Sequence, residues 1–157
     1  MPAVDELRVR PFEPRDQHAA RRLILEGLGA HFGHIDESMN PDLDDIAASY
    51  ASAVFLVAER GGRVVGTGAL TPEPDGSAGP TRLGRIQRMS TAADHRRRGV
   101  GSAVLRTLLA HARERGYSAV ILSTVERWDD AVAFYTAAGF RITHRTGDGD
   151  VHFIMRL

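Results

Sequence analysis

The sequence contains no cysteine among its 157 residues. Disulfide bonds, thiolate nucleophiles and cysteine-ligated zinc are therefore excluded. Nor is there an excess of charge of either sign, because Lys plus Arg and Asp plus Glu each number 20 and the formal net charge is zero. Domains that bind nucleic acids are usually basic overall. The charge balance therefore argues against a nucleic-acid partner, although it leaves room for a local basic site.

Long hydrophobic runs are also missing. The N-terminal stretch MPAVDELRVRPFEPRD lacks the apolar core of a signal peptide. No later run is long and apolar enough to span a bilayer. From these absences we expect a cytoplasmic protein without a membrane partner, and the length fits one domain over residues 1–157.

The patterns that are present alternate between strand and helix, in the expected order β-α-α-β-β-β-α-β-α-β-β. Two apolar runs flank Gly61-Gly62, which is typical of a β-hairpin. Asn40 followed by Pro41 predicts the start of a helix that continues to residue 50. The strand, helix and strand around residues 83 to 125 predict a right-handed parallel crossover. We therefore expect an α/β (α+β) fold with a mixed sheet.

Three consecutive arginines precede the central helix, in the stretch ADHRRRGVGSAVLRTLLAHARERG. Arg96, Arg97 and Arg98 repel one another, and glycines at 99 and 101 weaken a helix start. A bound phosphate group would offset both effects. The first free amides of a helix carry partial positive charge, and glycine lets a ligand approach them closely. Residues 96–102 are therefore a candidate binding site for a diphosphate.

The type of phosphate ligand is narrowed by two absent motifs. No Gly-Lys-Ser/Thr follows, so the Walker A pattern is absent. The stretch Gly99-Val100-Gly101 lacks the third glycine of the dinucleotide-binding fingerprint, and no acidic residue is evident at the end of a next strand. One other interpretation stays open, that of a solvated basic helix start with glycines serving only the turn.

A second motif follows the next strand, in WDDAVAFYTAAGF at residues 128–140. Together the two motifs resemble the GNAT acetyltransferase superfamily. The run from Arg96 to Gly101 matches its Q/R-x-x-G-x-G/A signature, and the run from Ala131 to Phe140 matches its A-x-x-F/L-Y-x-x-x-G-F helix. The order of strands and helices matches this family from about residue 6 to 157.

The resemblance implies a GNAT fold, whose mostly antiparallel sheet is flanked by helices and contains a splayed parallel strand pair. It also implies acetyl-CoA as the co-substrate, with its pyrophosphate on residues 96–102 and its pantetheine arm along the preceding strand. The family often has Asn where this sequence has Trp128, so we expect Trp128 to pack on the arm or line the acceptor pocket. The residues that the resemblance assigns to the cofactor are Met89, Ser90, Thr91, Arg96, Arg97, Arg98, Gly99, Val100, Gly101, Ser102, Trp128 and Tyr135.

For catalysis, the resemblance assigns the general acid to Tyr135, whose family counterpart faces the thioester sulfur. A phenol and a thiol have ordinary pKa values of about 10 and 8.5, so the proton transfer is modestly uphill. A strand amide near Thr91 should polarise the carbonyl. Arg85 stands where some members carry a glutamate base. Glu126, or a water chain to bulk solvent, is the alternative base.

The acceptor should be a small-molecule or peptide amine. His31, His34 and Glu37 lie in the expected link between the first two helices, which often covers the acceptor site in this family. We expect no metal, because two histidines in a glycine-containing loop are a weak ligand set. The resemblance is also compatible with a homodimer of this chain that pairs through the terminal strands. The alternative function from another class is a non-catalytic sensor that binds an acyl-CoA.

Overall fold

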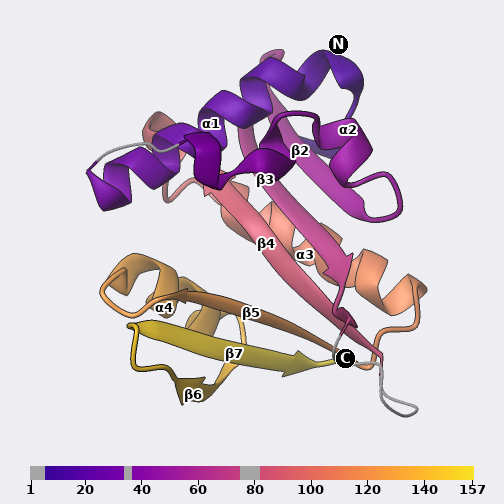
Figure 1. Ribbon diagram of the computed structural model, residues 1–157. Helices are drawn as coiled ribbons and strands as arrows, with labels where there is room; N and C mark the ends of the chain where they lie inside the picture. The colour runs from indigo at the N-terminus through magenta and orange to yellow at the C-terminus, as the bar shows by residue number, and fades with distance from the viewer. Residues whose placement is uncertain (1–5, 34–36, 75–81) are drawn as a thin grey trace.

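The computed structural model describes residues 6–33, 37–74 and 82–157, and within them seven strands form one sheet with helices on both faces (Figure 1). The strand order is β1-β2-β3-β4-β5-β7-β6. The strands are β1 (Arg8–Pro11), β2 (Val54–Arg60), β3 (Arg63–Pro72), β4 (Leu83–Thr91), β5 (Ala119–Val125), β6 (Arg141–Arg145) and β7 (Asp150–Arg156). The α-helices are α1 (Gln17–Phe32), α2 (Ile46–Ser49), α3 (Val100–Glu114) and α4 (Asp129–Ala137). The order of elements is the one expected from the sequence.

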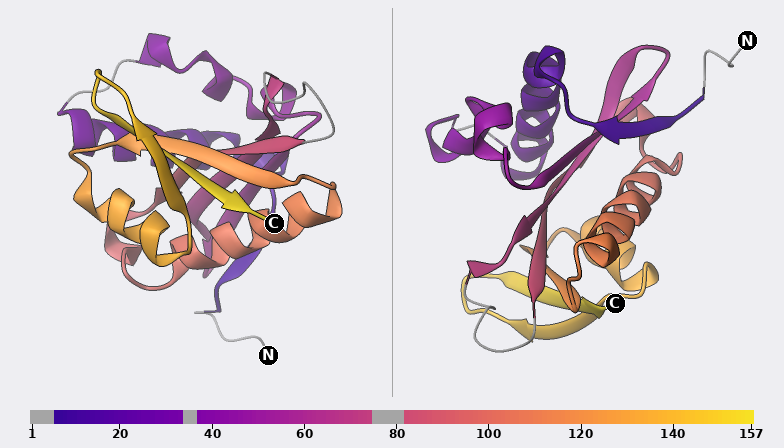
Figure 2. Two further views of the ribbon diagram at one scale, coloured as in Figure 1. Left: turned by 90° about the horizontal axis from the view of Figure 1, so that it is seen from below. Right: turned by 90° about the vertical axis from the view of Figure 1, so that its right-hand side faces the viewer.

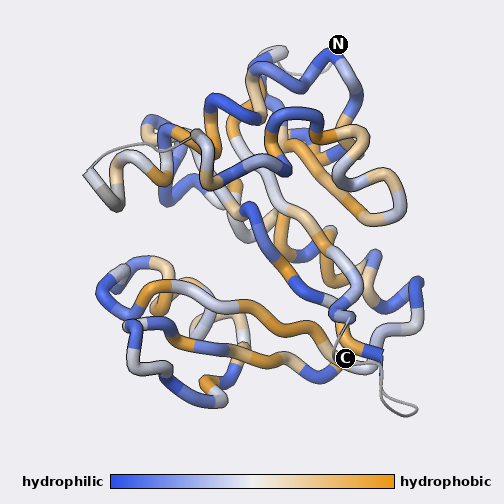
Figure 3. Tube along the Cα trace, viewed as in Figure 1, coloured by the Kyte–Doolittle hydropathy of each residue, from blue (hydrophilic) through white to orange (hydrophobic). Residues whose placement is uncertain are grey.

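The alternation of side chains along β2 gives the sheet its two cores. Val54 and Leu56 pack with α3 on one face, whereas Phe55 and Val57 pack with α1 and α2 on the other. This is the two-residue period of a strand that is covered on both sides. Figure 2 shows α1 and α2 on one side of the sheet and α3 on the other, and Figure 3 shows the apolar residues concentrated along the strands.

The two halves of the sheet meet at the parallel pair β4–β5, whereas the other neighbouring strands are antiparallel. The pairing covers only Leu83↔Ala119, Gly84↔Val120 and Arg85↔Ile121. Beyond these three pairs the backbones of the two strands diverge in a V shape (Figure 1), and the gap between these backbones is called the V-shaped opening. The predicted mixed sheet with a splayed parallel pair is confirmed.

A bulge interrupts β4 along the edge that pairs with β3, which is the edge away from the opening. The register with β3 shifts between Thr67↔Ser90 and Ala69↔Gln87, so β4 carries one extra residue. Arg88 lies within the bulge with a left-handed backbone, at φ +58°. The buried Thr67 hydroxyl donates a hydrogen bond of 2.7 Å to the Arg88 carbonyl oxygen. This bond gives a partner to a carbonyl within the interrupted ladder.

Helix α3 approaches β3 closely because two strand residues lack side chains. A Cβ atom built on Gly66 would lie 2.5 Å from Val100 Cγ1, and one on Gly68 would lie 2.6 Å from Val104 Cγ1. The predicted apolar stripe of this helix is buried: Val104, Leu105, Leu108, Leu109 and Ala112. The first turn of α3 is thereby held against the sheet beside the end of β4.

The second predicted helix is shorter than expected. Asn40 and Pro41 begin only a 3-10 turn (Pro41–Leu43), and α2 starts after Asp45, whose side chain accepts a bond from the Ala48 amide. The interruption is stabilised from α1. Gln17 donates to the Leu43 carbonyl at 2.8 Å and accepts from the Ile46 amide at 2.9 Å. A continuous helix over residues 40–50 was therefore a wrong prediction.

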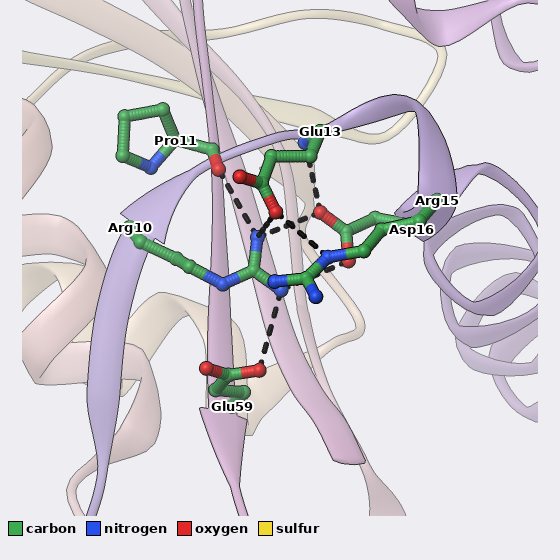
Figure 4. Close-up of polar contacts among 6 residues, drawn as sticks. All are labelled: Arg10, Pro11, Glu13, Arg15, Asp16 and Glu59. Carbon is green, nitrogen blue, oxygen red and sulfur yellow. Dashed lines mark hydrogen bonds and ion pairs between the residues drawn. The ribbon is translucent and has the colours of Figure 1, made fainter. Parts of the chain in front are cut away.

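A buried ion pair fastens β1 to the start of α1 (Figure 4). Arg10 donates to both carboxylate oxygens of Asp16, at 2.7 and 2.9 Å, and these side chains are only 9% and 5% exposed. Glu59 on β2 lies 3.3 Å from the same guanidinium. Among the described helices, none combines the length and the apolar character that crossing a membrane would need.

Candidate active site

The arginine-glycine turn lies at the N-terminus of α3, next to the wide end of the V-shaped opening. Gly99 is its N-cap, with φ +81°, and the Ala103 amide makes the first helical bond to the Gly99 carbonyl at 3.0 Å. The amides of Val100, Gly101 and Ser102 precede that bond, so they have no helical carbonyl partner. The Arg96, Arg97 and Arg98 side chains are exposed around them. Free amides and three cations therefore converge at one helix end.

Gly101 lies between the end of β4 and the second motif helix. A Cβ atom built there would be 3.4 Å from Phe134 Cζ and 3.8 Å from Thr91 Oγ1. The structure thus brings together β4, the α3 turn and α4, which are far apart in the sequence. Any ligand seated on the α3 amides has α4 on one side and the open edge of β4 on the other.

The turn is anchored to β3 through Asp94. Arg63 donates to Asp94 Oδ2 at 2.8 Å, and His95 Nδ1 lies 3.0 Å from Oδ1. The hydrogen bond from Arg63, assisted by His95, holds the pKa of Asp94 below its ordinary value. Asp94 therefore pairs with Arg63 of β3 at neutral pH, and both side chains of this ion pair are more than half exposed.

The last residues of β4 present their backbone to the opening. Beyond Arg85 this strand has no parallel partner, because β5 diverges. Met89 points toward α3, with its sulfur 2.7 Å from a Cβ position on Gly68, whereas Ser90 lies on the α1 side, with its Oγ 3.7 Å from a Cβ position on Gly27. Because these side chains point to the two faces of the sheet, the backbone N–H and C=O groups of residues 86–91 lie along the strand edges. Alternate groups therefore face the gap between β4 and β5.

Tyr135, which is on α4, is buried among aromatic rings. Its ring contacts those of Phe134, Phe140 and Phe153, at centroid distances of 5.1, 5.8 and 5.8 Å. Only 8% of the residue is exposed. Burial raises the pKa of the Tyr135 phenol well above its ordinary value. The phenol therefore keeps its proton at neutral pH.

Two other predicted residues flank α4. Trp128 is the half-buried N-cap residue of this helix, and its carbonyl accepts from the Ala131 and Val132 amides. Glu126 is 53% exposed and accepts a 2.8 Å bond from Arg145 on β6. This ion pair directs the Glu126 carboxylate toward β6. The catalytic role of Glu126 stays a prediction.

The predicted acceptor residues fall largely outside the described part of the chain. His34 lies outside it, and the side chains of His31 and Glu37 are not described. Their role in binding the acceptor stays a prediction. Within the described residues, no three His, Asp or Glu side chains form a group that could hold a metal ion.

Two polar clusters on the α1 face of β4 were missed by the sequence analysis. Arg88 donates to both carboxylate oxygens of Asp42, at 3.0 and 2.6 Å. Arg85 donates to Glu73 at 2.6 Å, at the point where β4 and β5 separate. The Arg88–Asp42 pair joins residues 46 positions apart, so no local pattern signals it. Glu73, however, lies two residues beyond Thr71, which is the partner of Arg85 in the register of β3 with β4.

Comparisons with known proteins agree with this geometry. The model of the Acetyltransferase (GNAT) family matches residues 3–140. The chain belongs to the GNAT family of acetyltransferases. It is 37% identical over 124 residues to N-acetyltransferase 8 of Mus musculus, an alignment that covers 77% of this GNAT chain and 53% of the mouse protein. The chain thus spans about half the length of the curated relatives it matches.

Solved structures show the same GNAT fold. An acetyltransferase of the GNAT family from Staphylococcus aureus superposes with a TM-score of 0.82 at 19% identity, covering 97% of this chain and 99% of that one. A PaiA N-acetyltransferase from Thermoplasma acidophilum, crystallised in complex with coenzyme A, has a TM-score of 0.80 at 13% identity, with coverage of 97% and 99%. At these identities the likeness concerns the fold.

Proposed function

We propose that this chain is one N-acetyltransferase domain that moves an acetyl group from acetyl-CoA to a primary amine by direct attack in a ternary complex. The observation that carries the proposal is the continuity between three parts of the site. The first turn of α3 lies beside the end of β4 and beside Phe134 of α4, and β4 has no parallel partner beyond Arg85. Acetyl-CoA has a diphosphate, an amide-bearing arm and a thioester in the same order.

The described residues fit each part of this co-substrate. The amides of Val100, Gly101 and Ser102, with the arginines before them, would hold the pyrophosphate. The backbone of Met89 and Thr91 would pair with the pantetheine amides, as a strand edge pairs with an added strand. Crystal structures of related folds with coenzyme A and acetyl-CoA support this assignment.

The Tyr135 phenol would act as the general acid. Attack by a neutral amine on the thioester carbonyl breaks the carbon–sulfur bond, and the departing thiolate needs a proton. The phenol is protonated at neutral pH, which is the state that a donor requires, but burial raises its pKa and makes the proton transfer more uphill than the ordinary values imply. A β4 amide near Thr91 would polarise the carbonyl oxygen. The proton of the amine would leave through water to bulk solvent or to Glu126.

The acceptor would be a small-molecule or peptide amine that enters from the α1 face of the sheet. The segment after α1 lies on that face and contacts β4 through Asp42 and Arg88. The names of the curated relatives also support amine acetylation.

Replacement of Tyr135 by Phe tests the proposal. The variant keeps the ring that packs against Phe140 and Phe153 and removes only the hydroxyl. We expect kcat to fall by about 10² to 10⁴, while the Kd for acetyl-CoA, measured by calorimetry, stays within about twofold. Turnover is followed as thiol release with a panel of free amino acids, spermidine, kanamycin and a lysine-containing peptide.

Two outcomes would contradict the proposal. Wild-type protein that releases no heat with millimolar acetyl-CoA would remove the co-substrate. Wild-type protein that binds acetyl-CoA but acetylates no amine of the panel would favour the alternative, a sensor of acyl-CoA. In the sensor case, the Tyr135→Phe variant would behave as the wild type does.

A further inference from the structure

The bulge of β4 contains an arginine in a backbone conformation that arginine seldom adopts. Arg88 has φ +58°, in the left-handed region where glycine is favoured. The conformation is set by the register shift with β3 and by the Thr67 bond to the Arg88 carbonyl. A non-glycine residue in such a position points to a task for its side chain.

That side chain is fully engaged by the segment between α1 and α2. Its Nε and Nη2 donate to the two carboxylate oxygens of Asp42, and its Nη1 donates to Asn40 Oδ1 at 3.1 Å. This is the planar fork geometry by which arginine holds a carboxylate in one orientation. Arg88 and Asp42 are 19% and 30% exposed, so water competes little for the pair.

Besides Arg88, the Tyr50 side chain also donates to the Asp42 carboxylate. The Tyr50 hydroxyl donates to Asp42 Oδ2 at 2.6 Å. Burial, together with this carboxylate, raises the pKa of Tyr50 to about 12, so the phenol remains a donor at neutral pH. Asp42 thus receives hydrogen bonds from Tyr50, which directly follows α2, and from Arg88 on β4.

The bulge also lies where the site is assembled. Met89 to Thr91, the backbone that the proposed function assigns to the pantetheine arm, directly follow Arg88. Since Gln87 and Ser90 flank the register shift and Arg88 and Met89 lie between them, the bulge decides which groups of β4 face the opening. The same residue therefore shapes the co-substrate edge with its backbone and holds residues 40–43 with its side chain.

We propose that Arg88 is a positioning residue, which holds Asp42 and Asn40 against the β4 bulge and so fixes the acceptor-side wall at a set distance from the strand that binds the thioester. The inference rests on the proposed function, because it assigns residues 40–43 to the acceptor side. Arg88 acts through Asp42 and does not touch the reacting atoms.

Replacement of Arg88 by Gly separates the side chain from the backbone. Glycine adopts the left-handed conformation easily, so the bulge is kept while the fork to Asp42 is lost. We expect the KM for the best amine of the panel to rise at least tenfold, with the Kd for acetyl-CoA within twofold of the wild type. Arg88→Lys, which keeps the charge but not the fork, should lie between the two.

Asp42→Ala should reproduce the effect from the other side of the pair, and Arg88→Gly/Asp42→Ala should be no worse than either single variant. Glu13→Gln, which weakens the ion pairs of Glu13 with Arg15 and Arg10, is the control away from β4 and should change neither constant. Hydrogen exchange gives a readout without an acceptor. Amides of residues 37–50 should exchange faster in Arg88→Gly and Asp42→Ala than in Glu13→Gln.

An unchanged KM, or a KM and an acetyl-CoA Kd that rise by the same factor, would overturn the proposal. If the wild type shows no activity toward the panel, the proposed function fails. The hydrogen-exchange measurement alone then tests whether Arg88 holds Asp42 and residues 40–43 in place. Exchange in residues 37–50 that equals that of Glu13→Gln would then overturn it, and faster exchange would support it.

Discussion

Asp16 is a carboxylate whose side chain is almost wholly removed from water, and Arg10 is its main partner. Burial would raise the pKa of Asp16, but hydrogen bonds from Arg10 and from the Glu13 amide outweigh it and hold the pKa below its ordinary value. A buried pair of this kind contributes little when intact, yet removal of one partner leaves a buried charge uncompensated. The geometry of β1 against α1 therefore depends on both members.

We expect Asp16→Asn to lower the free energy of unfolding at pH 7 by about 3 kcal/mol. The folded-state pKa of Asp16 is lowered, so its contribution is present above the unfolded value of about 3.9 and is lost as pH falls through the folded value. Urea titrations between pH 7 and pH 3 should show the gap between wild type and variant shrinking below about pH 4. A gap that stays constant over this range would contradict the assignment.

At the scale of single elements, β3 and α3 are fitted to each other through glycine. A Cβ atom on Gly68 would lie within 3 Å of Val104, Met89 and Leu108 side-chain atoms. These three side chains occupy the interface beneath the bulge, so none of them can move without disturbing a neighbour. The close approach of α3 is thus a property of β3 as much as of α3 itself.

Gly68→Ala should lower the free energy of unfolding by about 2 kcal/mol, because it overpacks this interface. Gly147→Ala is the matched control, since a Cβ atom there would meet nothing within 4 Å. The control should change stability by less than about 0.5 kcal/mol. Denaturant unfolding measures both variants, and equal stabilities for the two would show that the interface accommodates the methyl group.

Local patterns in the sequence were enough to predict the regular elements. The Gly61-Gly62 turn, with φ of +59° and +77°, and the buried stripe of α3 were both predicted correctly. The break between residues 40 and 50 was not, because the amide and carbonyl groups that it frees are satisfied by Gln17 from another helix. The β4 bulge and the Arg88–Asp42 pair likewise depend on contacts that form only in the folded chain.

At the scale of the whole molecule, the candidate site joins three regions that the sequence motifs identified separately. The resemblance located the α3 turn and α4, and the structure places Gly101 of one against Phe134 of the other. The acceptor side was predicted only as a segment, since its Arg88–Asp42 contact crosses 46 positions. The residues proposed for the co-substrate follow from a motif, whereas the contact proposed for the acceptor side depends on the particular packing of this chain.

Acetyl-CoA at about 100 times its Kd should stabilise the folded protein by about 2.7 kcal/mol. The thermal midpoint measures this effect, and hydrogen exchange locates it. We expect protection of residues 86–91 and of the first turn of α3, because both should donate amides to the co-substrate. Protection confined to any other surface would contradict the binding mode.

The narrow junction between β4 and β5 has a mechanical consequence. Within the sheet, three residue pairs connect the block from β1 to β4 with the block formed by β5, β7 and β6, whereas one apolar core with α3 side chains lies against both blocks. Acetyl-CoA bound in the proposed site would contact both blocks and would connect them across the gap between β4 and β5. Without acetyl-CoA, we expect the two blocks to differ in amide hydrogen exchange and in resistance to unfolding. With acetyl-CoA bound, we expect them to unfold together.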